Sequence, residues 1–190
     1  MKKLCVFTGA ATGSDPRFAE AAHQLGQILA SRNLGLVYGG GKSGLMGKIA
    51  DAVMASDGHA TGIIPKFLDN VEIAHRGLTE LHVIDTMHER KNMMYDIADG
   101  FIIMPGGLGT LDETMEIITW RQLGLHRKPI IIINLHGYWD HMLLLFQNII
   151  DKGFMHHGHT GHFEHVNDMD ELADRLDSYF PDSHRAAKQI

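Results

Sequence analysis

Two glycine-rich segments in this sequence have the composition of loops that hold an anion. The first is Gly39-Gly40-Gly41-Lys42-Ser43-Gly44 and the second is Pro105-Gly106-Gly107-Leu108-Gly109-Thr110, each between a short apolar run and a helical pattern. Glycine lets a backbone approach a ligand closely, and a helix start offers free N–H groups and the positive end of the helix dipole. The segments therefore predict phosphate binding, with Thr110 adding a hydroxyl donor. For the first segment, the alternative is tight packing between a strand and a helix.

A carboxylate stands close to the second glycine segment. Glu113 follows Thr110 by three residues, so the two side chains share one face of the predicted helix. A hydroxyl that binds phosphate and a carboxylate would then point toward one cavity. The alternative is electrostatic, because a carboxylate near the start of a helix is favourable with the helix dipole whatever else it does.

Two adjacent cations begin another predicted helix. The run Met87-His88-Glu89-Arg90-Lys91 follows the apolar stretch 81–84. Positive charge at a helix start opposes the dipole, so an anion nearby, such as a substrate phosphate or Glu113, would compensate it. The alternative is a solvated first turn. His88-Glu89 does not indicate a metalloprotease helix, because Asn92 stands where the second histidine is needed.

Three other patterns are incomplete. Gly41-Lys42-Ser43 is similar to the end of a P-loop, but Leu36 stands where that motif has a glycine. The first glycine segment has the spacing of a dinucleotide fingerprint, yet Pro65 and Lys66 follow the next strand where that motif wants an acid. The histidine-rich run His156–His165 has no cysteine ligands and contains glycine, so we expect no specific metal site.

Short apolar runs alternate with amphipathic helical patterns along the chain. This alternation predicts an α/β fold, an open parallel sheet with helices on both faces. Ligands of such sheets lie beyond the carboxyl ends of the strands, where both glycine segments fall. A closing helix is expected over 168–180, with a single domain over 1–180 and a flexible tail over 181–190. The predicted strands are Leu4–Thr8, Leu36–Tyr38, Ala60–Ile64, Leu81–Ile84, Phe101–Met104 and Ile130–Asn134.

Composition argues against two classes of function. The chain has 190 residues, 44% of them hydrophobic, and a formal net charge of −6. This charge offers no general basic surface to nucleic acid, and no stretch approaches the ~20 apolar residues of a membrane span. The only cysteine, Cys5, lies in the first apolar run, where we expect a core residue. The N-terminal apolar run is too short for a secretory signal, so a cytoplasmic protein is expected.

Three motifs in the same chain resemble the signatures of one enzyme family. The segment from Pro105 to Glu113 matches the PGGxGTxxE pattern of the Lonely Guy family, whose members are cytokinin riboside 5′-monophosphate phosphoribohydrolases. Met87–Lys91 is similar to a second signature and Gly39–Gly47 to a third. The resemblance covers about Lys3 to Phe154. It implies a Rossmann-like fold, a homodimer, and a hydrolase that uses no metal or cofactor.

The resemblance also implies which residues act. Arg90 and Glu113 fall on the catalytic arginine and glutamate of the family. Two serines often follow the first strand's glycine in the family, whereas Ala10 and Ala11 stand here. The base therefore stays open between adenine, an isoprenoid-modified adenine and another base. The resemblance and the three signatures together give a predicted substrate-binding set of Glu72, Met87, Lys91, Gly106, Gly107, Gly109, Thr110, Thr119, Gly40 and Gly41.

Cleavage of an N-glycosidic bond gives the paired charges a chemical role. The reaction builds positive charge on the sugar and negative charge on the leaving base. We assign Glu113 to stabilise the sugar cation and to position or deprotonate water, and Arg90 to orient the nucleotide. Two rival interpretations are a nucleotide-binding regulatory module without catalysis and a pyridoxal-phosphate decarboxylase, which needs a Schiff-base lysine.

Two predicted helices also suggest self-association. The stretches 87–98 and 111–123 carry methionines and other apolar residues on more than one face. Broad apolar faces on helices that flank a sheet serve as partner surfaces as well as core. A homodimer is predicted, and the alternative is that these side chains only fill the core.

Overall fold

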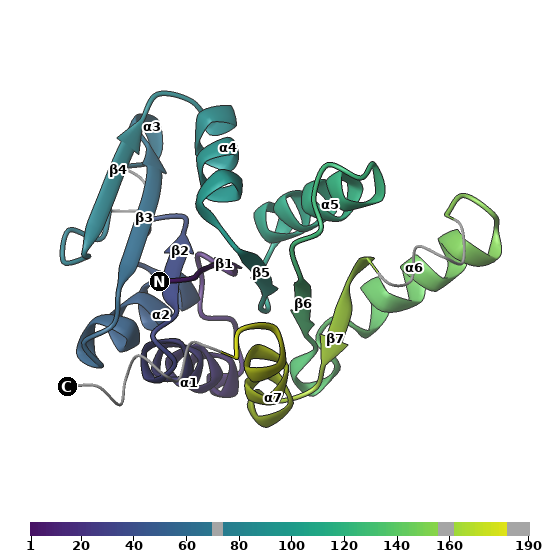
Figure 1. Ribbon diagram of the computed structural model, residues 1–190, viewed down its shortest axis with the longest axis horizontal. Helices are drawn as coiled ribbons and strands as arrows, with labels where there is room; N and C mark the ends of the chain where they lie inside the picture. The colour runs from purple at the N-terminus through teal and green to yellow at the C-terminus, as the bar shows by residue number, and fades with distance from the viewer. Residues whose placement is uncertain (70–73, 156–161, 182–190) are drawn as a thin grey trace.

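One parallel sheet organises the protein. The computed structural model describes residues 1–69, 74–155 and 162–181, and within them seven strands pair in the order β4-β3-β2-β1-β5-β6-β7 (Figure 1). All six predicted strands are confirmed to within one residue at each end. The strands are β1 (Lys3–Phe7), β2 (Gly35–Tyr38), β3 (Ala60–Pro65), β4 (Glu80–Ile84), β5 (Gly100–Ile103), β6 (Ile130–Ile133) and β7 (Glu164–Val166).

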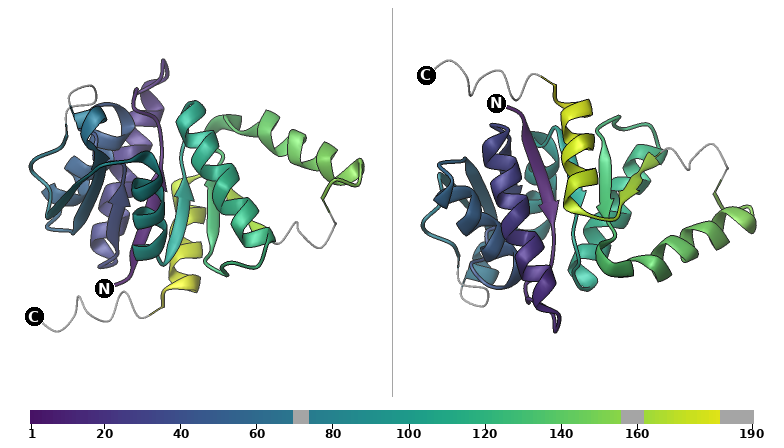
Figure 2. Two further views of the ribbon diagram at one scale, coloured as in Figure 1. Left: turned by 90° about the horizontal axis from the view of Figure 1, so that it is seen from above. Right: turned by 90° about the horizontal axis from the view of Figure 1, so that it is seen from below.

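Helices cover both faces of the sheet, as predicted. Figure 1 shows α1, α2 and α7 below the sheet and α4 and α5 above it, while α6 leads away from the sheet, as Figure 2 also shows. A helix of three residues, α3, follows β3, and a single 3₁₀ turn, η2, follows β6. The helices are α1 (Pro16–Ser31), α2 (Gly44–Ala55), α3 (Lys66–Leu68), α4 (Met87–Ile97), α5 (Leu108–Gln122), η2 (Leu135–Gly137), α6 (Asp140–Asp151) and α7 (Met169–Tyr179).

Hydrophobic burial on the two faces holds these layers together. One core cluster joins α1, α2 and α7 to the sheet, and the other joins α4, α5 and α6 to it. The four isoleucines of β6 are all buried and alternate between the two clusters. Strands buried on both faces have this continuously apolar character. The prediction for Cys5 is confirmed, since its side chain is fully buried in β1.

The helix boundaries follow from local capping. Asp15 accepts a hydrogen bond from the Arg17 N–H, and Pro16 occupies the first helical position of α1. Thr86 and Glu89 form a reciprocal capping box that begins α4 where the chain leaves the sheet edge. This capping places Arg90 at the end of the first turn of α4.

The strand order reverses between β1 and β5. The chain runs outward from β1 through β2 and β3 to β4, and then returns to place β5 beside β1. At such a switch point the loops after the two strands diverge and leave a crevice, which is the usual ligand site of an open α/β sheet. The segments that follow Phe7 and Ile103 therefore meet there.

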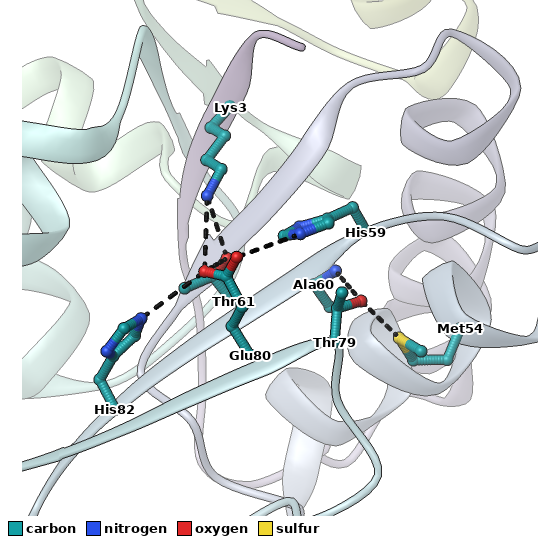
Figure 3. Close-up of polar contacts among 8 residues, drawn as sticks. All are labelled: Lys3, Met54, His59, Ala60, Thr61, Thr79, Glu80 and His82. Carbon is teal, nitrogen blue, oxygen red and sulfur yellow. Dashed lines mark hydrogen bonds and ion pairs between the residues drawn. The ribbon is translucent and has the colours of Figure 1, made fainter.

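The opposite, amino ends of the strands carry a polar cluster. Glu80 lies between His59 and His82, with Nε2–carboxylate distances of 3.5 and 3.6 Å, and the Lys3 ammonium lies 3.7 Å away (Figure 3). The Thr61 hydroxyl donates to the same carboxylate. Loss of hydration raises the pKa of Glu80, but the positive charge of Lys3 and the contacts with His59, His82 and Thr61 lower it by more, so the net pKa is below its usual value. The cluster ties β1, β3 and β4 together away from the crevice.

None of the helices in the described parts of the chain combines the length and the apolar character that crossing a membrane requires.

We predict that Gly26→Ala destabilises the protein. Gly26 is buried where α1 crosses α2, and a Cβ there would lie 2.6 Å from both Ala52 Cβ and the Ile49 carbonyl oxygen. Overpacking of this kind costs about 1–3 kcal/mol, which exceeds the gain of about 1 kcal/mol that alanine brings to a helix. Thermal unfolding should show a lower Tm than wild type. Gln27→Ala, at an exposed position of the same helix, is the control and should leave the Tm nearly unchanged. A Gly26→Ala protein as stable as wild type would contradict the packing argument.

Candidate active site

The candidate site lies where the loops after β1 and β5 are tied together. The Thr8 hydroxyl and the Gly9 N–H both donate to the Pro105 carbonyl, at 3.0 and 3.1 Å. The Met104 N–H donates to the Phe7 carbonyl at 2.9 Å. These bonds fix the start of the second glycine segment against the end of the central strand.

A cavity of about 240 Å³ opens at this junction. It gathers Gly39, Arg90 and Glu113, which come from three separate motifs of the sequence. Strand ends, the loops that follow them and the first turns of helices form the lining. The lining residues are Val6, Thr8, Gly9, Ala10, Gly39, Met46, Arg90, Gly107, Gly109, Thr110 and Glu113.

Arg90 and Glu113 form a nearly buried ion pair across the cavity. Arg90 Nη2 lies 3.5 Å from Glu113 Oε1, and only 10% and 12% of the two side chains are exposed. Arg90 Nε donates to the Ile63 carbonyl at 3.2 Å, and Nη1 contacts Met87 Sδ at 3.3 Å. Two opposite charges with this little water around them attract each other strongly.

Gly39 makes room for the guanidinium. A Cβ on Gly39 would collide with Arg90 Nη2. Gly39 therefore has a steric role in the site, although the sequence prediction did not include it among the ligand-binding residues.

The start of α5 is open to an anion. Gly107 is the N-cap of α5 and has no side chain with which to cap the first turn. A Cβ built on Gly107 or Gly109 would have no heavy atom of the described chain within 4 Å, apart from its chain neighbours and the backbone of its own helix. Neither glycine has a positive φ. Backbone conformation and internal packing thus leave these two glycines unexplained, whereas the close approach of a ligand explains both.

Thr110 and Glu113 lie on the face predicted for them. Thr110 is 3% exposed and lines the same cavity as Glu113. A Cβ on Gly106 would collide with the Thr110 hydroxyl, so this glycine is required by packing within the loop.

A second chamber of about 360 Å³ adjoins the cavity and shares Gly9, Ala10 and Gly107 with it. Its described lining includes no charged residue. Aromatic and small apolar side chains dominate, and Phe18 and Tyr138 meet edge to face with ring centroids 5.4 Å apart. The lining residues are Gly9, Ala10, Ala11, Thr12, Gly13, Phe18, Leu45, Pro105, Gly106, Gly107 and Tyr138.

Internal contacts hold much of the first glycine segment in place. The Gly9 carbonyl accepts from the Leu45 and Met46 N–H groups at 3.1 and 3.4 Å, so the chain itself occupies the start of α2. Gly40 has φ +75° and packs on β3, and Gly41 bridges to Ala74. Of the two interpretations of this segment, tight strand–helix packing accounts for these contacts. Ligand contacts by Gly40 and Gly41 stay predictions.

Three other predicted residues lie away from the cavity lining, and one lies outside the described residues. Lys91 Nζ binds Asp112 at 2.7 Å and Glu116 at 3.4 Å, and these carboxylates raise its pKa despite partial burial. Thr119 is exposed farther along α5, and Met87, outside the cavity lining, contacts the Arg90 guanidinium through its sulfur. Glu72 falls in the segment 70–73, outside the described residues.

Neither a metal site nor a reactive thiol accompanies the ion pair in the described chain. Its His, Cys, Asp and Glu side chains make no group that could hold a metal, and 156–161 of the histidine-rich run lie outside it. Burial, with Glu113 nearby, raises the pKa of the Cys5 thiol well above its usual value, so Cys5 is a neutral core residue.

Comparison with known proteins identifies the family. A family model described as possible lysine decarboxylase matches residues 46–176. A cytokinin riboside 5′-monophosphate phosphoribohydrolase of Arabidopsis thaliana is 41% identical over 181 residues, which span 95% of this chain and 83% of its own. A probable enzyme of the same name from Oryza sativa subsp. japonica is 39% identical over 180 residues, 95% of this chain and 79% of its own.

The chain belongs to the Lonely Guy family. Solved structures of molybdenum cofactor proteins share its Rossmann-like fold. A carrier protein of Chlamydomonas reinhardtii has a TM-score of 0.72 at 14% identity, covering 95% of this chain and 98% of its own. A binding protein of Rippkaea orientalis has a TM-score of 0.70 at 20% identity, covering 94% and 97%. These likenesses concern the fold of the Lonely Guy chain alone.

Sequence reasoning missed several residues of this Lonely Guy site. Thr8, Gly39 and Met46 line the cavity, and Tyr138 lines the adjoining chamber. The position of Thr8 after the first strand was the available signal, because ligands lie beyond strand carboxyl ends. Tyr138 follows β6, the neighbour of β5, and its sequence context has no motif that points to the site.

We predict that Gly109→Ala separates stability from ligand binding. The added Cβ would meet open space in the ligand-free protein, and alanine is the better helix former by about 1 kcal/mol. The variant should therefore be at least as stable as wild type by thermal unfolding. It should bind AMP more weakly by calorimetry, because the methyl group occupies the space next to the free N–H groups. Unchanged AMP affinity would contradict an anion site at the start of α5.

Proposed function

We propose that this protein hydrolyses the N-glycosidic bond of a nucleoside 5′-monophosphate and releases the free base and ribose 5-phosphate. One observation carries the proposal: the nearly buried Arg90–Glu113 pair lies one helical turn from the open start of α5. The names of the relatives support a cytokinin riboside 5′-monophosphate as substrate, with AMP as the simpler analogue. The proposed reaction consumes only water and needs no metal or cofactor.

The phosphate anchors the substrate at the start of α5. Free N–H groups around Gly107 and Gly109, with the Thr110 hydroxyl, surround an anion and add the field of the helix dipole. Binding energy gained at this non-reacting group holds the ribose in a productive orientation. The anomeric carbon then lies toward Glu113, one turn along the helix.

Glu113 carries the chemistry at the sugar. The C1′–N bond breaks and its electron pair leaves with the base, while a water oxygen bonds to C1′. The Glu113 carboxylate stabilises the cationic sugar and accepts the proton of the water, which then passes to the base nitrogen. The low exposure of Glu113 strengthens its field on the cation.

Arg90 complements the opposite charge. Its guanidinium is held by the Ile63 carbonyl and by Glu113, and it faces the cavity in which negative charge develops on the base. An arginine does not lose its proton under these conditions, so it acts through its charge and its N–H groups.

The rivals fit the cavity less well. A pyridoxal-phosphate decarboxylase needs a lysine beside its cofactor, and the described lining of the cavity contains none. Lys91 is engaged with Asp112 and Glu116 instead. A purely regulatory nucleotide module remains the second interpretation. Release of free base from AMP or a cytokinin riboside 5′-monophosphate separates it from the hydrolase.

We predict that Glu113→Gln lowers kcat by about 10²- to 10⁴-fold, the usual contribution of a positioned acid–base group. The amide keeps the shape of the side chain but loses the charge that stabilises the sugar cation. Nucleotide binding should largely persist, as measured by calorimetry with AMP. Glu116→Gln is the matched control, because this carboxylate lies one turn further along α5 and pairs with Lys91. If Glu113→Gln retained more than a tenth of the wild-type kcat, Glu113 would not be the catalytic carboxylate.

We predict strong discrimination in favour of one 5′-phosphate. Loss of two charge-assisted contacts of about 1.5–3 kcal/mol each should lower kcat/KM for adenosine at least about a hundredfold relative to AMP. ATP should also be poor, because the adjoining chamber offers space but its described lining gives no countercharge for further phosphates. Free base and ribose products would be followed for AMP, adenosine, ATP and an isoprenoid-modified AMP. Equal cleavage of adenosine and AMP would remove the phosphate anchor from the mechanism.

We also propose a homodimer, formed through the outer faces of α5 and α6. Some of the apolar side chains that the sequence placed on α4 and α5 fill the core, since Met94, Ile117 and Ile118 are buried. Others are strongly exposed on and after these helices. They are Leu123 at 68%, Leu125 at 63%, Leu144 at 64%, Leu145 at 50% and Phe154 at 85%. A cytoplasmic location stays a prediction of the sequence.

Light scattering at micromolar concentration tests the dimer. A species of about 42 kDa is expected, twice the 21.1 kDa of one chain. Leu144→Asp should shift the mass toward one chain, because it places a charge in the proposed apolar interface. A wild-type protein that scatters only as 21 kDa would contradict the homodimer.

A further inference from the structure

Tyr138 contacts the phosphate loop from outside the three sequence motifs. Its hydroxyl donates to the Gly106 carbonyl at 2.6 Å, and its ring lines the chamber beside the cavity. We propose that Tyr138 is a positioning residue that orients the Gly106–Gly107 peptide so that the Gly107 N–H faces the substrate phosphate. The proposal rests on the proposed function, because it names the residue that prepares the phosphate subsite of that reaction.

Peptide geometry supplies the first step. Every peptide bond in the described chain is trans, so the C=O and N–H of one peptide unit point in opposite directions. Tyr138 holds the Gly106 C=O toward the uncharged chamber. The N–H of the same unit belongs to Gly107, which also lines the cavity that contains Arg90 and Glu113. Fixing the carbonyl on one side thus directs the N–H to the other.

The peptide needs such a restraint because glycine lies on both sides of it. Two consecutive glycines permit more backbone conformations than any other pair, and a rotated unit would present its carbonyl oxygen to the phosphate. The preceding unit is already held, since Thr8 and the Gly9 N–H both donate to the Pro105 carbonyl. Tyr138 provides the corresponding bond for the next unit.

The turn that carries Tyr138 is itself rigidly built. Asn134 accepts from the Trp139 N–H at 2.7 Å and donates to Asp140 at 2.8 Å. The Tyr138 ring packs edge to face on Trp139 and on Phe18, with centroids 4.7 and 5.4 Å apart. The ring is therefore placed by packing, and its hydroxyl reaches the loop carbonyl from a fixed position.

Tyr138→Phe tests the proposal because it removes the donor and keeps the ring. Kd for AMP and for ribose 5-phosphate, measured by calorimetry, should rise about tenfold, as expected when one charge-assisted hydrogen bond is weakened. The kcat/KM for AMP should fall by a similar factor, whereas that for adenosine should not change. The Tm should stay close to that of wild type. In NMR spectra, the large shift of the Gly107 amide on AMP binding should be reduced.

Tyr95→Phe is the matched control. The Tyr95 hydroxyl also donates to a backbone carbonyl, that of Leu125 at 3.3 Å, which lies just beyond the end of α5 opposite the phosphate loop. This variant should bind AMP like wild type. Equal AMP affinity of Tyr138→Phe and wild type would overturn the positioning role and leave the hydrolase proposal intact. Equal losses for AMP and adenosine would also overturn it, because they indicate a general structural effect. AMP that binds to wild type without being cleaved would instead overturn the hydrolase alone.

Discussion

The burial of two opposite charges at one point of the fold constrains the rest of the site. Arg90 and Glu113 retain about a tenth of their surface in water, so neither would be stable there without the other. They come from helices that follow strands at different places in the sheet, β4 at the edge and β5 beside the centre. Gly39, at the end of β2, leaves the space that the guanidinium occupies. The ion pair therefore depends on three crossovers meeting at the carboxyl ends of the strands.

The glycines of this chain answer to different physical causes, although the sequence displays them alike. Gly26 and Gly44 are required because a Cβ would strike a neighbouring backbone or helix, and Gly40 because its φ is positive. Among the glycines of the described residues, free space and an ordinary backbone conformation coincide next to a helix start at Gly107 and Gly109. We therefore expect an anion to bind where small glycines leave space beside the free N–H groups at the start of α5. The first segment fails this criterion because the Gly9 carbonyl already binds the start of α2.

The strands and the paired charges of the candidate site were predictable from the sequence because their signals are local. Continuous apolar runs mark the six strands, but β7, Glu164-His165-Val166, has a single apolar residue and joins the sheet only through its pairing with β6. The positions of Arg90 and Glu113 follow from their motifs. Thr8 and Tyr138 were not predictable in the same way, because each acts on a backbone carbonyl of the loop. Every residue carries a backbone carbonyl, so the residue type does not show which carbonyl will accept a side-chain hydrogen bond.

The register of α5 places the open start of the helix and Glu113 beside the same cavity. A helix rises about 5.4 Å per turn, which is of the order of the span from a ribose 5′-phosphate to the anomeric carbon. Thr110 and Glu113 are three residues apart on one helix face, so in the proposed reaction the phosphate and the reacting carbon of one nucleotide would meet successive positions of that face. A single residue inserted between them would rotate the carboxylate by about 100° around the helix axis and remove it from the cavity. In the proposed reaction the motif spacing therefore matches the size of the substrate, which gives a physical reason for the glycine loop and the carboxylate to lie in one continuous segment.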